Sequence, residues 1–220
     1  MGKGSAGYVA NGERGLECVS EFGIRCAAGS GAGESAVGAM DAEGCCGGAG
    51  LVGFGVGKIF SIHRPDSALT RANAGGTMNA ELAAVLQRAL AVAKETDGAF
   101  DPTIRPLADL WGFIKKEGYR MPTDAELRIA LTQVDYRKVD LRKGRLQFAA
   151  QDMSIDSGGF GKGYAVDRAI AALQRHGIAH AMVKAGGDLR VIGLPPGQRH
   201  WTVYLEDPKK KGNRVAVQLK

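Results

Sequence analysis

Apolar residues recur every three to four positions in three segments of the chain, which is the spacing of an amphipathic helix. The segments are residues 79–95, 123–134 and 163–176. Asn79 opens the first as a helix N-cap, and Thr123 with Glu126 forms the capping box that typically begins a helix. Gly177 ends the third stripe, in the position that glycine prefers after a helix. The pattern therefore predicts three helices with defined ends.

Shorter runs rich in apolar and β-branched residues alternate with these helices and predict strands. The runs lie near residues 138–148, 181–192 and 200–206. Val215–Leu219 also alternates like a strand, although the sequence shows no partner for it. Helices and strands mixed in this way predict an α+β fold.

A glycine-rich turn precedes the third helix, within SIDSGGFGKGYAVD at Ser154–Asp167. Glycines let the backbone approach a ligand closely, and a glycine loop before a helix N-terminus commonly holds phosphate. The P-loop pattern fails because Tyr164 follows Gly163, and the glycine spacing also departs from the dinucleotide fingerprint. A turn that binds nothing is the alternative, but Asp156 and Lys162 are charged groups that a turn does not require.

A second polar segment, TDGAFDPTIRPLADLWGF at Thr96–Phe113, follows the first helix. Its Asp-Gly pair ends that helix, and Asp101 then lies with a proline and a threonine in a rigid loop that can turn a carboxylate toward a ligand. The alternative is a plain helix stop and turn, followed by an aromatic cluster of Trp111 and Phe113 that packs in the core.

A third segment, FSIHRPDSALTRAN at Phe60–Asn73, is polar and turn-prone around its Pro-Asp-Ser sequence. His63 within it has two interpretations, either as an ordinary surface histidine or as a planar ring that stacks on an aromatic ligand. The residue alone does not decide between them.

In this order and spacing, the three segments resemble the ApbE family, the FAD:protein FMN transferases. The resemblance covers roughly residues 58–220 and rests on GAFDPTI at Gly98–Ile104, LWGF at Leu110–Phe113, GGFGKGYAVD at Gly158–Asp167 and AGGDLRVIG at Ala185–Gly193. Each motif alone is unspecific, whereas their combination is specific. The resemblance implies an ApbE-like α+β fold that is incomplete.

The resemblance implies a magnesium-dependent enzyme that transfers FMN from FAD to a Thr or Ser hydroxyl of a partner flavoprotein and releases AMP. This is phosphoryl transfer, in which the protein mainly positions the diphosphate and neutralises its charge. FAD is thus the expected substrate, Mg²⁺ the expected cofactor and an acceptor flavoprotein the expected partner. Family members usually work in the bacterial cell envelope or periplasm, although no signal peptide is visible in this sequence.

The resemblance also implies roles for individual residues. The positions that correspond to FAD-binding residues of the family are His63, Ala99, Phe100, Asp101, Asp156 and Lys162. Lys162 is placed to meet negative phosphate, and His63 falls where the family often has an aromatic residue beside the flavin. Gly159 corresponds to a position whose main-chain carbonyl helps to hold the metal. No catalytic residue is assigned.

The family continues past the last residue of this chain, and that further part contributes a catalytic histidine region and an Asp/Thr pair that binds the metal. We therefore expect this chain to lack its C-terminal part and to transfer no FMN by itself. Two alternatives stay open, a relative that binds or hydrolyses FAD without transfer and an inactive gene fragment. AMP release measured with and without an acceptor protein separates the first alternative from a transferase.

Residues 1–57 differ in composition from the rest of the chain. They hold 17 of the 33 glycines and all four cysteines, and the opening motifs of the family are not recognisable in them. They are interpreted either as a natural, disordered leader or as the product of a reading-frame error, and the abrupt start of an intact motif after them favours the second. The cysteine spacing fits neither a zinc pair nor a C-x-x-C dithiol.

The chain is basic, with a formal net charge of +6 and a pI of about 9.2. Its lysines and arginines are spread out and are not interleaved with aromatic residues, so nucleic acid is not an expected partner. We expect this positive charge to attract FAD and an acidic surface of a partner protein instead.

Overall fold

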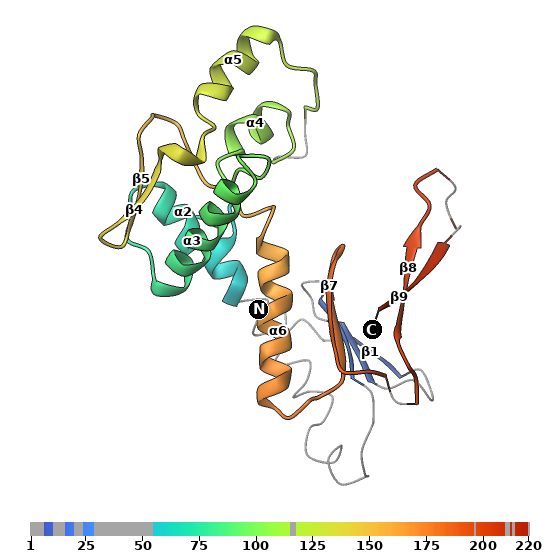
Figure 1. The fold of residues 1–220 in the computed structure, drawn as a ribbon. Helices are drawn as coiled ribbons and strands as arrows, with labels where there is room; N and C mark the ends of the chain where they lie inside the picture. Colours follow the sequence, from blue (N-terminus) through green and yellow to red (C-terminus); the bar gives the residue numbers. More distant parts are fainter. Residues whose placement is uncertain are drawn as a thin grey trace. The chain divides into compact units, whose positions relative to one another are not determined.

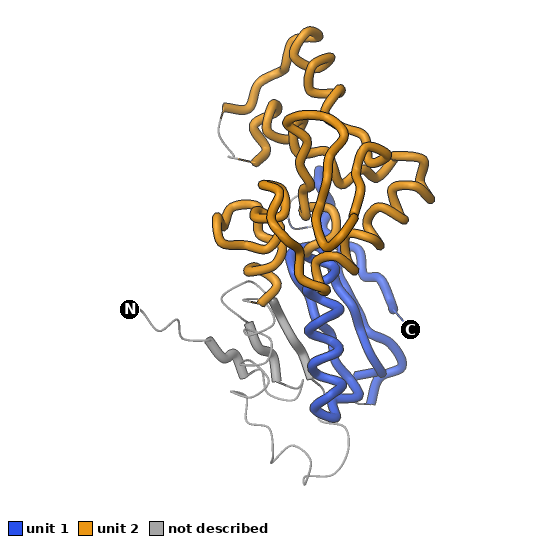
Figure 2. Tube along the Cα trace, turned by 90° about the vertical axis from the view of Figure 1, so that its left-hand side faces the viewer, with its two compact units in different colours: residues 1–54, 162–220 blue, residues 55–161 orange. Residues whose placement is uncertain are grey.

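The computed structural model describes residues 7–10, 16–19, 24–28, 55–114, 118–195, 197–209, 212 and 214–219. The chain divides into two compact units, shown in different colours in Figure 2. One unit is Gly55–Gly161, and the other combines Met1–Phe54 with Lys162–Lys220. Apart from three short strands and residues 55–57, the segment 1–57 lies outside the described residues, so its nature stays a prediction.

The unit formed by Gly55–Gly161 is mainly helical (Figure 1). Its helical segments are residues 55–60, α2 (Ala68–Asn73), α3 (Ala80–Glu95), α4 (Arg105–Leu110), α5 (Asp124–Thr132) and the short 3₁₀ helix η2 (Tyr136–Lys138). The strands β4 (Val139–Arg142) and β5 (Arg145–Phe148) pair as an antiparallel hairpin. The helices predicted at 79–95 and 123–134 are confirmed as α3 and α5.

Helix α3 begins and ends at the residues that the sequence indicates. The side chain of Asn79 accepts a hydrogen bond from the Leu82 amide at 2.8 Å, which satisfies one of the free N–H groups of the first turn. At the other end Gly98 has a φ of +81°, and its amide donates to the Ala93 carbonyl at 2.8 Å. The buried stripe of the helix is Leu82, Leu86, Ala89 and Ala93.

The strand predicted near residues 138–148 is in fact two strands, β4 and β5. Lys143 and Gly144 both have positive φ angles, 51° and 69°, which is the geometry of a tight type I′ hairpin turn. The apolar pattern missed the turn because both arms of a hairpin keep the alternation of a strand.

The second unit holds an antiparallel sheet with the strand order β1-β2-β3-β6-β7. Its strands are β1 (Gly7–Ala10), β2 (Leu16–Val19), β3 (Ile24–Ala28), β6 (Ala181–Ala185) and β7 (Asp188–Ile192). The predicted strand 181–192 is therefore also a hairpin. It turns at Gly186, whose φ of +62° favours glycine at the first turn position.

Helix α6 (Gly161–Arg175) confirms the third helical stripe and buries it against this sheet. The core cluster consists of Val166, Ala169, Ile170 and Leu173 from the helix with Ala181, Val183 and Ala185 from β6. Small residues on β6 allow the helix to lie close to the sheet, and Gly177 ends the helix with a φ of +78°.

Strand β8 (Trp201–Glu206) confirms the predicted strand near 200–206 and forms a separate two-stranded sheet with β9 (Arg214–Leu219). The expectation that Val215–Leu219 has no partner is wrong, because β9 pairs with β8 along its whole length. Within the described part of the chain, no helix is long and apolar enough to cross a membrane.

Candidate functional site

A pocket of about 620 Å³ lies entirely within the unit Gly55–Gly161. Its walls come from the loop after α3, from α4, from the end of α5 with η2, and from the glycine-rich turn before α6. Its lining includes Asp97, Ala99, Phe100, Asp101, Asp135, Tyr136, Arg137, Asp156 and Gly159. The pocket thus brings together the segment that holds Asp101 and the glycine-rich turn, both of which the sequence singled out. The segment Asp135–Arg137, which the sequence did not single out, also lines it.

The Asp101 carboxylate holds two walls of the pocket together. Its Oδ1 accepts hydrogen bonds from the amide and the hydroxyl of Thr103, at 2.8 and 2.7 Å, and its Oδ2 accepts from the Tyr136 amide at 2.9 Å. Thr103 is fully buried, and its hydroxyl oxygen also accepts from the Asp135 amide at 2.9 Å. Both oxygens of Asp101 therefore accept hydrogen bonds from the protein itself. The resemblance implies that this carboxylate contacts the ligand, and that contact stays a prediction.

Asp156 is held at the base of the glycine-rich turn. Its amide donates to the Pro102 carbonyl at 2.8 Å, and the Asn73 side chain brackets the preceding Ile155 with two hydrogen bonds. The residue is only 8% exposed, and its Oδ1 accepts a hydrogen bond from the Gly158 amide. Because Oδ2 accepts no hydrogen bond from any described residue, it can receive a donor from a ligand in the pocket.

Two glycines of the turn are required by close contacts. A Cβ at Gly159 would stand 2.9 Å from Cε2 of Phe100, and one at Gly158 would stand 2.8 Å from Oδ1 of Asp156. Real Cβ atoms do not approach other atoms so closely, so any larger residue would displace the ring or the carboxylate. The glycines here are needed for the shape of the pocket wall, and the predicted close approach of the backbone to a ligand stays a prediction.

The wall formed by Asp135, Tyr136 and Arg137 was not singled out by the sequence. The Arg137 guanidinium donates to both Asp135 oxygens, at 2.8 and 3.2 Å, and this contact lowers the pKa of Asp135 and raises that of Arg137. The sequence showed only that Asp135 is suited to a turn, and a turn residue by itself does not indicate a site.

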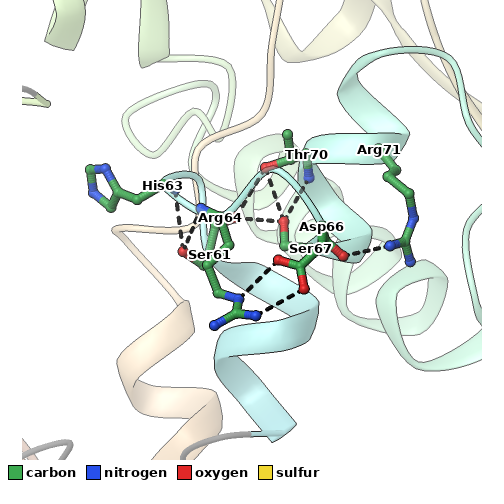
Figure 3. A network of polar contacts seen from close by, with 7 residues as sticks. All are labelled: Ser61, His63, Arg64, Asp66, Ser67, Thr70 and Arg71. Atoms are coloured by element: carbon green, nitrogen blue, oxygen red, sulfur yellow. Dashed lines mark hydrogen bonds and ion pairs between the residues drawn. The ribbon is translucent and has the colours of Figure 1, made fainter. Parts of the chain in front are cut away.

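His63 does not line the pocket. Its amide donates to the Ser61 hydroxyl at 3.2 Å, and its ring extends away from the polar cluster around Ser67 (Figure 3). That cluster is structural, because Ser67 caps α2 through the Thr70 amide and donates to the Ser61 carbonyl. Within the described residues His63 is an exposed side chain, and its predicted contact with the flavin stays a prediction.

Lys162 belongs to the other unit and is not among the residues that line the pocket. Its ammonium lies 3.9 Å from Asp188, and a Cβ at Gly186 would lie 3.6 Å from its Cδ atom. The glycine-containing turn between β6 and β7 therefore leaves room for this side chain. Its proposed contact with phosphate stays a prediction.

The predicted aromatic cluster does not pack in a core. Trp111 and Phe113 stack with ring centroids 6.3 Å apart, but Phe113 is 58% exposed, and the exposed Tyr119 lies 5.9 Å from it. The stacking is a surface feature because helix α4 ends at Leu110 and leaves these rings on the chain that follows it.

The oxygen atoms at the glycine-rich turn supply only part of the set of ligands that Mg²⁺ requires. Among the described residues, no three side chains of His, Cys, Asp or Glu gather as a set of metal ligands. Asp156 supplies one free carboxylate oxygen and Gly159 a main-chain carbonyl. Mg²⁺ often takes one or two carboxylates and completes its shell with water and substrate phosphates, so these residues fit an ion held largely by its substrate.

The fold is that of solved flavin transferases. The chain matches the ApbE protein of Thermotoga maritima with a TM-score of 0.79 and 26% identity, over 98% of this chain and 68% of that one. It matches the apo flavinyl transferase ApbE of Pseudomonas stutzeri with a TM-score of 0.75 and 26% identity, over 89% and 61% of the two chains. These matches confirm the predicted α+β, ApbE-like fold.

The model of the ApbE family matches residues 55–220, and the chain belongs to this family. It is 32% identical to the FAD:protein FMN transferase of Treponema pallidum over 179 residues, which are 72% of this chain and 49% of that protein. It is 34% identical to the protein of the same name from Vibrio cholerae over 163 residues, which are 70% and 48% of the two chains. The chain therefore spans about half the length of the curated relatives that it matches.

Proposed function

We propose that this chain is the FAD-binding part of an FAD:protein FMN transferase. In the proposed reaction a Thr or Ser hydroxyl oxygen of an acceptor flavoprotein forms a bond to the phosphorus of the FMN half. The bond from that phosphorus to the bridging oxygen breaks, and the electron pair leaves with AMP. The proton of the acceptor hydroxyl passes to a base. Membership of the family and the composition of the pocket support this proposal.

The observation that carries the proposal is that Ala99, Phe100, Asp101, Asp156 and Gly159 all line one pocket. The pocket volume lies in the range of small-molecule sites, and its walls combine aromatic rings with hydrogen-bond acceptors. In the proposed complex Oδ2 of Asp156 accepts a hydrogen bond from FAD, and Phe100 packs against an apolar part of it. Lys162 meets the diphosphate, as the resemblance implies.

Magnesium belongs to the same proposal. The Gly159 carbonyl is the described group that would hold it, with water and the phosphates of FAD as further ligands. The ion would neutralise charge on the diphosphate. A location in the bacterial cell envelope and an acceptor flavoprotein as partner are likewise proposed on the resemblance alone.

The test is a calorimetric titration of the purified chain with FAD. We expect Gly159→Ala to weaken FAD binding about tenfold, because its methyl group displaces Phe100. Gly57→Ala is the matched control, since a Cβ at Gly57 meets nothing within 4 Å, and it should leave FAD affinity unchanged. Thermal unfolding of both variants shows whether each is folded.

Absence of FAD binding by the unaltered, folded chain would contradict the proposal. AMP release is measured in parallel, with and without an acceptor flavoprotein. We expect the chain by itself to release no AMP. Release that requires the acceptor would show that this chain transfers FMN, and release without the acceptor would favour the FAD-hydrolysing alternative.

A further inference from the structure

The charges that line the pocket are strongly unequal. Four carboxylates belong to its walls, those of Asp97, Asp101, Asp135 and Asp156. Arg137 is the one positively charged residue among the described lining residues. A negatively charged ligand group would be repelled at most positions in this pocket, and Arg137 marks the place where it is tolerated.

Arg137 is held in place by its neighbours. Its Nε and Nη2 atoms donate to the two oxygens of Asp135, and its main-chain amide donates to Oδ1 of the same residue at 3.0 Å. The guanidinium carbon lies 6.0 Å from the centre of the Tyr136 ring, within the range of a cation–π contact. Asp135 is itself fixed, because its amide donates to the buried Thr103 hydroxyl.

The guanidinium retains free donors in this arrangement. Its Nη1 group donates to no described residue, and the side chain is 74% exposed. A guanidinium is planar and presents several N–H groups in a fixed fork, which matches the oxygens of a phosphate. A pre-oriented fork loses little rotamer freedom when an anion binds.

We propose that Arg137 is the residue of this pocket that contacts a phosphate group of the bound nucleotide. The neutral parts of the ligand then lie among the aromatic rings and acceptor oxygens of the other walls. This inference rests on the proposed function only in naming FAD as the nucleotide, since any phosphate-bearing nucleotide would use the same contact.

The experiment compares ADP with adenosine, which share the base and the sugar and differ in the phosphates. The full 220-residue chain is titrated with each by calorimetry, without divalent cations, so that no ion bridges phosphate to carboxylate. We expect Arg137→Ala to weaken ADP binding about three- to tenfold and to leave adenosine binding unchanged. Arg137→Lys should show a smaller loss for ADP, because it keeps the charge and loses the fork.

Arg142→Ala is the matched control. Arg142 pairs with Asp140 two residues before it, as Arg137 pairs with Asp135, and its side chain is 75% exposed, but it does not line the pocket. Its removal should change neither affinity. Equal losses for ADP and adenosine in Arg137→Ala would overturn the proposal, since they would indicate a packing role, and so would an unchanged ADP affinity.

A parallel titration with FAD separates this inference from the proposed function. If ADP binding depends on Arg137 while FAD does not bind, the inference stands and the proposed function fails. If FAD binds and Arg137→Ala changes neither FAD nor ADP affinity, the inference fails and the proposed function stands.

Discussion

Replacement of Asp101 by Asn tests whether the hydrogen bonds of this carboxylate join two walls of the pocket. In the structure it accepts three hydrogen bonds, from the amide and the hydroxyl of Thr103 and from the amide of Tyr136. Asparagine has the same shape but only one acceptor oxygen, because its second terminal atom is an NH₂ donor. At least one N–H group in the wall of the pocket therefore loses its partner.

The magnitude follows from the type of bond. A hydrogen bond to a charged group contributes about 1.5–3 kcal/mol, and a donor left without a partner costs about 1–3 kcal/mol. We expect Asp101→Asn to lower the free energy of unfolding by about 1–3 kcal/mol, as measured by urea unfolding. The hydrogen exchange of the Tyr136 amide should speed up, since that amide is the donor that faces the altered atom.

Asp109→Asn provides the matched control for this change. Asp109 is 44% exposed on α4, and its ion pair with Arg105 spans 3.5 Å, so its replacement should change the unfolding free energy by less than about 0.5 kcal/mol. If Asp101→Asn is as stable as the control and its Tyr136 amide exchanges at the original rate, the carboxylate does not join the two walls.

Three further predictions concern other parts of the molecule. Asp156→Ala or Lys162→Ala should weaken FAD binding by about 1–3 kcal/mol, the usual cost of a lost charge-assisted contact, and unchanged titrations of both variants would refute the site assignment. Hydrogen bonds from Arg120, then from the Thr123 amide and hydroxyl, lower the pKa of Glu126 from 4.5 to about 2. Its contribution to α5 is thus complete above about pH 4.5 and is lost as the pH falls through about 2, so the protection of the α5 amides, relative to the intrinsic exchange rate at each pH, should fall over this window and should fall less in Glu126→Gln. Ile170→Ala should lower the free energy of unfolding by about 2–5 kcal/mol because it leaves a cavity under α6, whereas Ile129→Ala on the exposed face of α5 should cost far less, and equal losses would contradict the packing described.

Local signals in the sequence were sufficient for the three longest described helices, α3, α5 and α6, but not for the short helices α2 and α4. The Asn79 cap and the Thr123–Glu126 capping box formed as predicted, because a cap is satisfied by residues within one turn of it. Gly98 and Gly177 ended their helices for the same local reason. The family was also recognisable from the sequence, since its motifs occur in a fixed order along the chain.

The hairpins and the partner of the last strand needed the structure. Periodicity tells which face of a strand is apolar, but it does not tell where a two-residue turn reverses the chain, as at Lys143 and Gly144. The pairing of β9 with β8 joins segments on either side of a loop, and a strand pattern carries no information about its partner.

For the site, the sequence determined which segments carry chemistry, and the tertiary structure decided what each side chain does there. Asp101 and Asp156 look alike in the sequence, as carboxylates beside turns. In the structure both oxygens of Asp101 accept hydrogen bonds from Thr103 and Tyr136, whereas only one oxygen of Asp156 accepts a hydrogen bond from a described residue. Arg137 lines the pocket as part of η2, and hydrogen bonds from the Asp135 and Tyr136 amides join this segment to Thr103 and Asp101 in the loop after α3. Hydrogen bonds between residues more than thirty positions apart depend on how the chain folds back on itself, and no local pattern specifies that.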